Sequence, residues 1–217
     1  SEVGMIPAEL MGLNNKKFKQ FNNLIKNKSF FNSIISNVNN ILRLIKRKKL
    51  NSVILNYDET ADNFLKWYQQ LVAESLGKKG KGIFPIISTM PKDNHSLMQL
   101  YLDGPKDNFY TFFNVTNKFS PKIKSRIIPE SQKFLKNKNM DSIKNSQILA
   151  TQKVFKKKNI PFRSFSIKNR SEETLGELFS FFIFETILLA KALKINPYDQ
   201  PSVELIKTET KKILTSY

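Results

Sequence analysis

The chain has 217 residues, enough for one domain with appendages, and 40% of them are hydrophobic, so a sizeable core can form. No apolar run reaches the about 18 residues that would predict a membrane span, and the absence of cysteine excludes disulfides and thiolate metal sites, as is typical of cytosolic proteins. The net charge is +18, from 36 basic and 18 acidic residues, and it is the one compositional hint of a partner.

This charge has two interpretations. It indicates a polyanionic partner such as nucleic acid, or it reflects an AT-rich genome, whose codons favour Lys, Asn, Ile and Phe. The basic residues are spread along the chain in short runs, at Lys46–Lys49, Lys78-Lys79 and Lys156–Lys158, which suit helix ends. No recognition motif accompanies them. We favour the compositional interpretation and expect no nucleic-acid partner, although a basic surface could still attract a phosphorylated metabolite.

The first half of the chain alternates between helical spacing and short apolar runs, which predicts helices and strands in turn. The predicted elements are helices over 18–28 and 30–50, a strand over Ser52–Tyr57, a helix over Asp58–Leu76, a strand over Gly82–Ser88, a short helix from about Asp93-Asn94 and a strand over Asn108–Val115. Gly77 is the expected helix stop and Asp103–Pro105 a turn. Lys78–Gly82 is too short for a phosphate-binding loop and is expected to be a turn.

The second half begins with polar, irregular residues over 116–140. A helix over 141–158, a strand over Pro161–Ile167, a long helix over Ser171–Lys194 and a last helix from Pro201 follow. The apolar run Leu178–Ala190 is interrupted by Ser180 and Glu185, and we interpret it as a buried helix. Strands that alternate with helices predict an α/β fold, a three-layer α-β-α sandwich with a mostly parallel sheet. Ligands of such folds bind at the carboxyl ends of the strands.

His95 is the single histidine of the chain. Imidazole is the side chain best suited to proton transfer near neutral pH, and this residue lies near a predicted helix start. A lone histidine more often serves packing or lies on the surface, so its role depends on what accompanies it.

Two other groups of polar residues follow apolar elements. Glu74 lies in the last turn of the helix that ends at Leu76, where it could be a general base or an ordinary solvated glutamate. Gln200, Glu204 and Lys207 share one face at the start of the last helix, where they offer an amide, a carboxylate and an ammonium group. The alternative for Glu204 and Lys207 is a surface ion pair three residues apart.

Three segments carry a family resemblance. Trp67–Lys78 contains Glu-Ser-Leu-Gly-Lys, Asp93–Pro105 contains Asp-Asn-His-Ser-Leu-Met-Gln, and Tyr198–Lys207 reads Tyr-Asp-Gln-Pro-Ser-Val-Glu-Leu-Ile-Lys. They resemble the helix ending in Glu-Ser-x-Gly-Lys, the bacterial Asp-x-His-Ser-x-x-Gln loop and the C-terminal signature aromatic-Asp-Gln-x-Gly-Val-Glu-x-x-Lys of glucose-6-phosphate isomerase (phosphoglucose isomerase). Ser202 departs from the signature, which has Gly or Ala there. This is a small change at a helix start.

The resemblance implies the C-terminal half of a bacterial-type enzyme. Ser1–Ala8 resembles what directly follows the family's Gly-Gly-Arg-aromatic-Ser motif. That motif, and the preceding sugar isomerase domain with the substrate-phosphate site, are then missing. We expect residues 1–50 to be helices linking from that first domain, 51–194 to form a sugar isomerase-type α/β domain, and 195–217 to be the C-terminal helix with the signature lysine.

The family interconverts glucose 6-phosphate and fructose 6-phosphate through a cis-enediol, a step of glycolysis and gluconeogenesis. The resemblance implies that Glu74 is the catalytic base, that His95 and Lys207 open the sugar ring, and that Gln200 helps to hold the sugar. In the family the histidine comes from the neighbouring subunit, so a homodimer is implied, with a sugar phosphate substrate, no metal or organic cofactor and no membrane partner. Without the first domain, the chain alone is expected to be nearly inactive.

Two other functions remain open from the residues. One is a non-catalytic sugar-phosphate-binding domain of the same fold, although a sensor would not need a base such as Glu74. The other is a basic nucleic-acid-binding protein, which predicts that lysines and arginines gather on one face and that DNA affinity falls steeply with salt.

Overall fold

The computed structural model describes residues 2–19, 21–116, 120–123 and 128–216. Within them, four parallel strands form one sheet in the order β2-β1-β3-β4. The strands are β1 (Asn51–Asn56), β2 (Phe84–Thr89), β3 (Asn108–Val115) and β4 (Phe162–Ile167). In register, Val53 of β1 lies between Ile86 of β2 and Tyr110 of β3, and Phe112 of β3 lies beside Ser164 of β4. The predicted α/β class with a parallel sheet is confirmed.

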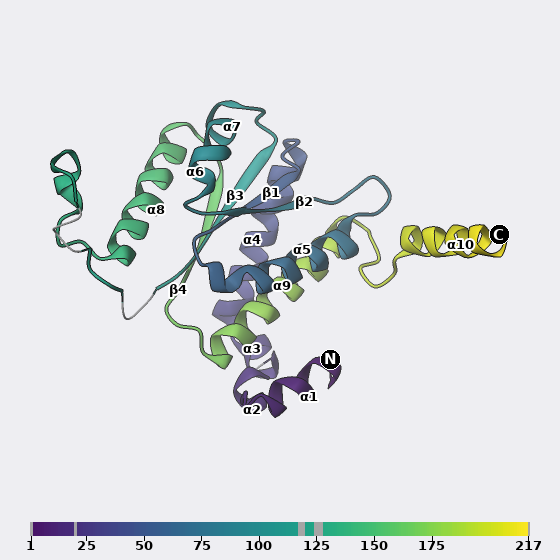
Figure 1. The fold of residues 1–217 in the computed structure, drawn as a ribbon. Helices are drawn as coiled ribbons and strands as arrows, with labels where there is room; N and C mark the ends of the chain where they lie inside the picture. Colours follow the sequence, from purple (N-terminus) through teal and green to yellow (C-terminus); the bar gives the residue numbers. More distant parts are fainter. Residues whose placement is uncertain (1, 20, 117–119, 124–127, 217) are drawn as a thin grey trace.

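The helices cover both faces of this sheet (Figure 1). They are α1 (Glu2–Leu10), α2 (Asn15–Phe18), α3 (Phe21–Lys26), α4 (Lys28–Lys46), α5 (Asp62–Leu76), α6 (Asp93–Ser96), α7 (Met98–Asp103), α8 (Met140–Lys157), α9 (Glu172–Ala192) and α10 (Pro201–Thr215). Short 3₁₀ turns lie at Glu59–Ala61 and Glu130–Leu135.

Two cores result from the alternation of side chains along the strands. On one face, α4, α5 and α9 pack over Ile54 and Phe113 of the sheet, around the fully buried Phe182 of α9. On the other face, α7 and α8 pack over Leu55 and Phe112. Both faces of the central strand β1 are therefore buried, which is why its residues form a continuous apolar run.

The interrupted apolar run is a buried helix, as predicted, and its glutamate is paired. The Glu185 side chain is 1% exposed, and its Oε2 atom lies 2.5 Å from Nη1 of Arg163 on β4. Arg163 Nε also donates to Thr111 Oγ1 at 2.9 Å, and Asn37 of α4 donates to Glu185. The buried charge of Glu185 on α9 is thus neutralised by Arg163, which lies 22 positions earlier in the sequence, on the neighbouring strand β4.

Helices α2, α3 and α4 pack on α9. Gly176 of α9 permits the closest approach, because a Cβ atom there would collide with the carbonyl oxygen of Phe18. Further along, α4 contributes Ile34, Val38 and Ile41 to the core. The division of the chain at residue 50 stays a prediction.

Most boundaries agree with the sequence pattern to within a few residues, and β3 agrees at both ends. The helix predicted to reach Leu50 ends at Lys46, because Lys48 adopts a positive φ of 61° and turns the chain into β1. The helix predicted from Asp58 starts with the 3₁₀ turn instead. The N-terminal helix α1 agrees with the expectation of helices over 1–50, although the sequence pattern gave it no bounds of its own. Of the irregular segment 116–140, residues 117–119 and 124–127 lie outside the described residues.

Candidate active site

Glu74 lies in the last turn of α5, beside the start of β2. Its Oε1 atom accepts a hydrogen bond from Nε2 of Gln70, one turn earlier, at 2.8 Å. Its Oε2 atom accepts from Nε2 of Gln200 at 2.7 Å. The structure therefore brings together two of the four predicted site residues, which lie 126 positions apart in the sequence. Gln200 precedes the first residue of α10, Pro201, which occupies the first helical position as predicted.

Two lysines hold the segment between α9 and α10 against the end of α5. Lys78 Nζ donates to the carbonyl oxygen of Asn196 at 2.6 Å and lies 3.0 Å from Oδ1 of Asp199. Lys81 Nζ donates to the carbonyl oxygen of Leu193 at 2.9 Å. The Lys78 side chain is only 9% exposed, so this contact is part of the fold. These residues were not predicted as site residues, although Lys78 is the last residue of the Glu-Ser-Leu-Gly-Lys segment.

Lys207 lies two turns further along α10 and does not contact Glu74 in the described structure. Its Nζ atom is 2.6 Å from Oε1 of Glu204, and both side chains are 66% exposed. This is the surface ion pair that the i, i+3 spacing allows. None of the residues of α10 is buried, and the helix extends away from the sheet and its covering helices (Figure 1).

His95 lies at the opposite edge of the sheet, after the end of β2, and its side chain is exposed. It is the third residue of α6, a helix of a single turn. Asp93 fixes this turn to β2, because its Oδ2 atom accepts from the Thr89 N–H at 2.7 Å and the Ser88 hydroxyl at 2.8 Å, while Oδ1 accepts from the Ser96 hydroxyl at 3.0 Å. Burial alone would raise the pKa of the Asp93 carboxyl, but these hydrogen bonds, with Lys92 nearby, hold it below its usual range.

The length of β2 separates Glu74 from His95. α5 ends where β2 begins, and α6 starts after β2 ends. Six residues of strand span roughly 17–20 Å, so one chain does not bring the carboxylate and the imidazole to the same small substrate. The Glu74–Gln200 pair lies at the amino-end edge of the sheet, and His95 lies at the carboxyl-end edge.

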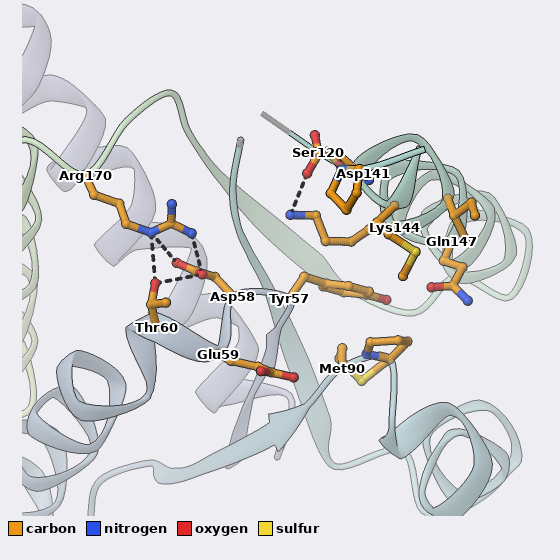
Figure 2. Close-up of a pocket in the computed structure, with 14 residues that line it drawn as sticks. Tyr57, Asp58, Glu59, Thr60, Met90, Ser120, Asp141, Lys144, Gln147 and Arg170 are labelled. Carbon is orange, nitrogen blue, oxygen red and sulfur yellow. Dashed lines mark hydrogen bonds and ion pairs between the residues drawn. The ribbon is translucent and has the colours of Figure 1, made fainter. Parts of the chain in front are cut away.

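A cavity of about 670 Å³ lies at the carboxyl-end edge, where the fold class predicts ligands. Figure 2 shows Tyr57, Lys144 and Arg170 around it, and Met90 from the loop that leads to His95. Both cations are paired: Arg170 Nη2 lies 2.6 Å from Asp58 Oδ1, and Lys144 Nζ lies 3.0 Å from Asp141 Oδ1. Neither of these two cations is therefore left to pair with a phosphate in the cavity.

Within the described ranges, no cluster of three or more His, Asp or Glu side chains is arranged to hold a metal ion. Nor is any helix in these ranges both long enough and apolar enough to cross a membrane.

Solved structures show the same fold in other proteins. A hypothetical protein of Thermus thermophilus superposes with a TM-score of 0.85 at 23% identity, covering 99% of this chain and 54% of that one. A glucose-6-phosphate isomerase of Chlamydia trachomatis superposes with a TM-score of 0.60 at 17% identity, covering 76% and 35%. At such identities these likenesses show the fold alone.

Curated relatives are similar over nearly the whole chain, although no protein-family model matches it. The chain is 32% identical over 225 residues to a probable glucose-6-phosphate isomerase of Methanococcus maripaludis, a match that covers 99% of this chain and 50% of the relative. It is 32% identical to the glucose-6-phosphate isomerase of Mycoplasmopsis synoviae, with 94% and 50% covered, and 31% identical to that of Methanocaldococcus jannaschii, with 97% and 52% covered. By these matches the chain belongs to the glucose-6-phosphate isomerase family, and it spans about half of the length of these curated relatives.

Proposed function

We propose that this chain contributes the catalytic base to a glucose-6-phosphate isomerase. The observation that carries the proposal is the hydrogen bond of 2.7 Å between Gln200 and Glu74, because it joins two separate segments of the family resemblance at one point in space. Lys78 and Lys81 support this arrangement by fixing the segment that precedes Gln200 to the end of α5.

In the proposed reaction, Glu74 removes the proton from C2 of the open-chain aldose and returns it to C1 through a cis-enediol. Gln200 orients the carboxylate and the sugar by donating its amide N–H groups. His95 and Lys207 act as acid and base at the ring oxygen and the O1 hydroxyl when the ring opens. The negative charge that develops on the enediol needs a fixed cation beside it, and by resemblance this is an arginine of the preceding domain.

The separation along β2 supports a site made from two chains. Glu74 and His95 of one chain lie at opposite edges of the sheet, so a homodimer would bring the His95 of one subunit to the Glu74 of the other. The proposal includes a sugar phosphate substrate and a cytoplasmic location, which the cysteine-free composition favours.

The exposed helix α10 supports a larger assembly. Val203, Ile206, Ile213 and Leu214 lie along one side of it by helical spacing and are 43%, 69%, 56% and 71% exposed. A stripe of this kind normally packs against another surface. We propose that the preceding domain or the second subunit covers it, which would also fix Lys207 near the substrate.

The base is tested in the full-length polypeptide with Glu74→Gln. This change keeps an oxygen that accepts from Gln200 but removes the basic carboxylate, so isomerisation and solvent-deuterium exchange into the sugar should both be lost while the melting temperature stays near that of the parent. The control is Glu177→Gln, an exposed glutamate of α9, which should leave turnover unchanged. Deuterium exchange at the parental rate in Glu74→Gln would show that another group is the base.

The need for further chain is tested with residues 1–217 alone. Phosphate binding and charge stabilisation supply much of the rate of such a reaction, so a coupled assay with fructose 6-phosphate should show almost no turnover. Turnover at the rate of a complete enzyme would contradict this expectation. Sugar-phosphate binding without turnover by the full-length protein would instead favour a non-catalytic domain of the same fold.

A further inference from the structure

Arginine is rare in this chain, and its placement is uneven. Only five of the 36 basic residues are arginines. Three of them, Arg43, Arg47 and Arg163, line one cavity of about 340 Å³ between the end of α4 and the starts of β3 and β4. Composition that favours lysine codons explains the many lysines, but it does not explain why the few arginines share a cavity.

Two of these arginines are available to a ligand. Arg43 lies in the last turn of α4, and Arg47, four residues later, is the residue that caps the end of this helix. Both are exposed, and among the described residues no carboxylate lies within ion-pair distance of either. Asn40, one turn before Arg43, adds an amide to the same wall.

The third arginine, Arg163, also lines the cavity, but its charge is already paired. Arg163 is held from behind by both carboxylate oxygens of Glu185, at 2.5 and 3.2 Å. Its charge is therefore matched, and its position is fixed. Apolar side chains, among them Ile41, Leu44 and Phe162, also line the cavity, so that a ligand bound there would be partly shielded from water.

We propose that this cavity is a binding site for a small phosphate ester or diphosphate, held by the guanidinium groups of Arg43 and Arg47. Guanidinium presents a planar pair of N–H donors that matches two phosphate oxygens, which a lysine ammonium does not. The volume lies at the lower end of ligand pockets, which start at about 300 Å³, so the occupant is a small molecule. The site does not include Glu74, Gln200 or Lys207.

The fold adds a favourable field around this cavity. Lys46–Lys49, Lys78–Lys81 and Lys156–Lys158 all lie at helix ends or in the loops that follow them, ahead of a strand. In a parallel sheet these segments meet at the amino-end edge, so runs that are far apart in sequence gather at the edge where the cavity opens. Such a concentration of cations attracts anions. A nucleic acid would use the exposed lysines of these runs, such as Lys79 and Lys156, whereas a small phosphate uses the concave arginine site.

The test is calorimetric titration of the 217-residue chain with pyrophosphate and with inorganic phosphate. We expect saturable binding of pyrophosphate to one site. Arg43→Ser/Arg47→Ser should abolish it, and Arg43→Lys/Arg47→Lys should weaken it by about tenfold or more, because the charge stays but the paired donors are lost. The control is Lys79→Ser/Lys156→Ser, which removes the same charge from the same edge outside the cavity and should change affinity by less than about threefold.

Three results would overturn the proposal. The first is no binding of pyrophosphate at millimolar concentration. The second is equal weakening by the arginine and the lysine variants, which would show attraction to diffuse surface charge. The third is a single-stranded oligonucleotide that displaces pyrophosphate and depends on the lysine runs as strongly as on Arg43 and Arg47, which would identify a nucleic-acid surface.

Discussion

Removal of the carboxylate of Glu185 should destabilise the protein strongly, because it leaves Arg163 charged and unpaired in the core. Glu185 is 1% exposed and the Arg163 side chain is 16% exposed. Loss of one partner from a buried ion pair costs about 3–5 kcal/mol. Because Arg163 retains some contact with solvent, we expect Glu185→Leu to cost about 3 kcal/mol, near the low end of that range.

The double variant Arg163→Met/Glu185→Leu should recover most of this loss, since both charges are then replaced by apolar groups of similar volume. The control is Glu209→Leu on α10, where Glu209 and Lys212 lie 2.6 Å apart but are 62% and 66% exposed. An exposed ion pair with nearly the same distance between its charged atoms contributes about 0–1 kcal/mol to the free energy of unfolding. The comparison therefore isolates the effect of burial.

Urea unfolding followed by far-UV circular dichroism measures these differences. With a urea dependence of about 3 kcal/mol per molar, Glu185→Leu should lower the midpoint by about 1 M, whereas the double variant and the control should lie close to the parent. A cost below about 1 kcal/mol for Glu185→Leu would refute the reasoning, and so would a double variant as unstable as the single one.

Two further predictions concern pH. Burial, with the nearby charge of Glu185, raises the pKa of Tyr68 to about 12, and burial raises the pKa of Tyr110 to about 12. The folded state therefore favours the neutral phenols, and their contribution to the free energy of unfolding is complete below about pH 10 and lost between about pH 10 and 12. For Tyr68 the loss should be about 2–3 kcal/mol. Tyrosinate absorbance that shows all six tyrosines of the folded chain ionising together near pH 10 would contradict it. Burial would raise the pKa of Asp93, but hydrogen bonds from Ser88, Thr89 and Ser96 outweigh it and lower this pKa. The ionised carboxylate therefore stabilises the folded state above about pH 4, and this stabilisation is lost as the pH falls below that value. Asp93→Asn should therefore reduce the loss of stability, measured by urea unfolding, that the parent shows when the pH falls below about 4, and an unchanged loss would exclude Asp93 as a cause.

The fold could be predicted from the sequence wherever one local signal sets a boundary. Asn108–Val115 is bounded by a turn and by polar residues, and its predicted limits are those of β3. Where tertiary packing decides, the pattern was less informative. Glu185 interrupts an apolar run in the sequence, and only the position of Arg163 in the fold explains why a charge is there.

The sequence named four candidate site residues by resemblance, and it could not show how they are arranged. Glu74 and Gln200 follow from the resemblance, and the structure places them in contact. The contribution of Lys78 depends on the carbonyl group of Asn196, 118 residues away, which no local pattern shows. The arginine cavity could not be predicted for the same reason, because Arg47 and Arg163 line one cavity only after β1, β3 and β4 have paired.

Parallel topology explains the distribution of functional groups in this chain. Because each helix runs back from the end of one strand to the start of the next, residues at helix ends gather at the amino-end edge, and residues that follow strands gather at the carboxyl-end edge. Glu74 belongs to the first group and His95 to the second. A change of side-chain conformation is too small to span the length of β2. Chemistry that needs both residues therefore requires a second copy of the chain, oriented so that its carboxyl-end edge meets the amino-end edge of the first.

The proposed reaction, together with the position of β2, predicts a homodimer, and this prediction can be tested sharply. Mixing inactive Glu74→Gln and His95→Ala full-length subunits should restore about a quarter to a half of the activity through mixed dimers with one intact site. Two inactive variants that stay inactive after mixing and confirmed subunit exchange would show that both residues act within one chain, and that the proposed site is wrong.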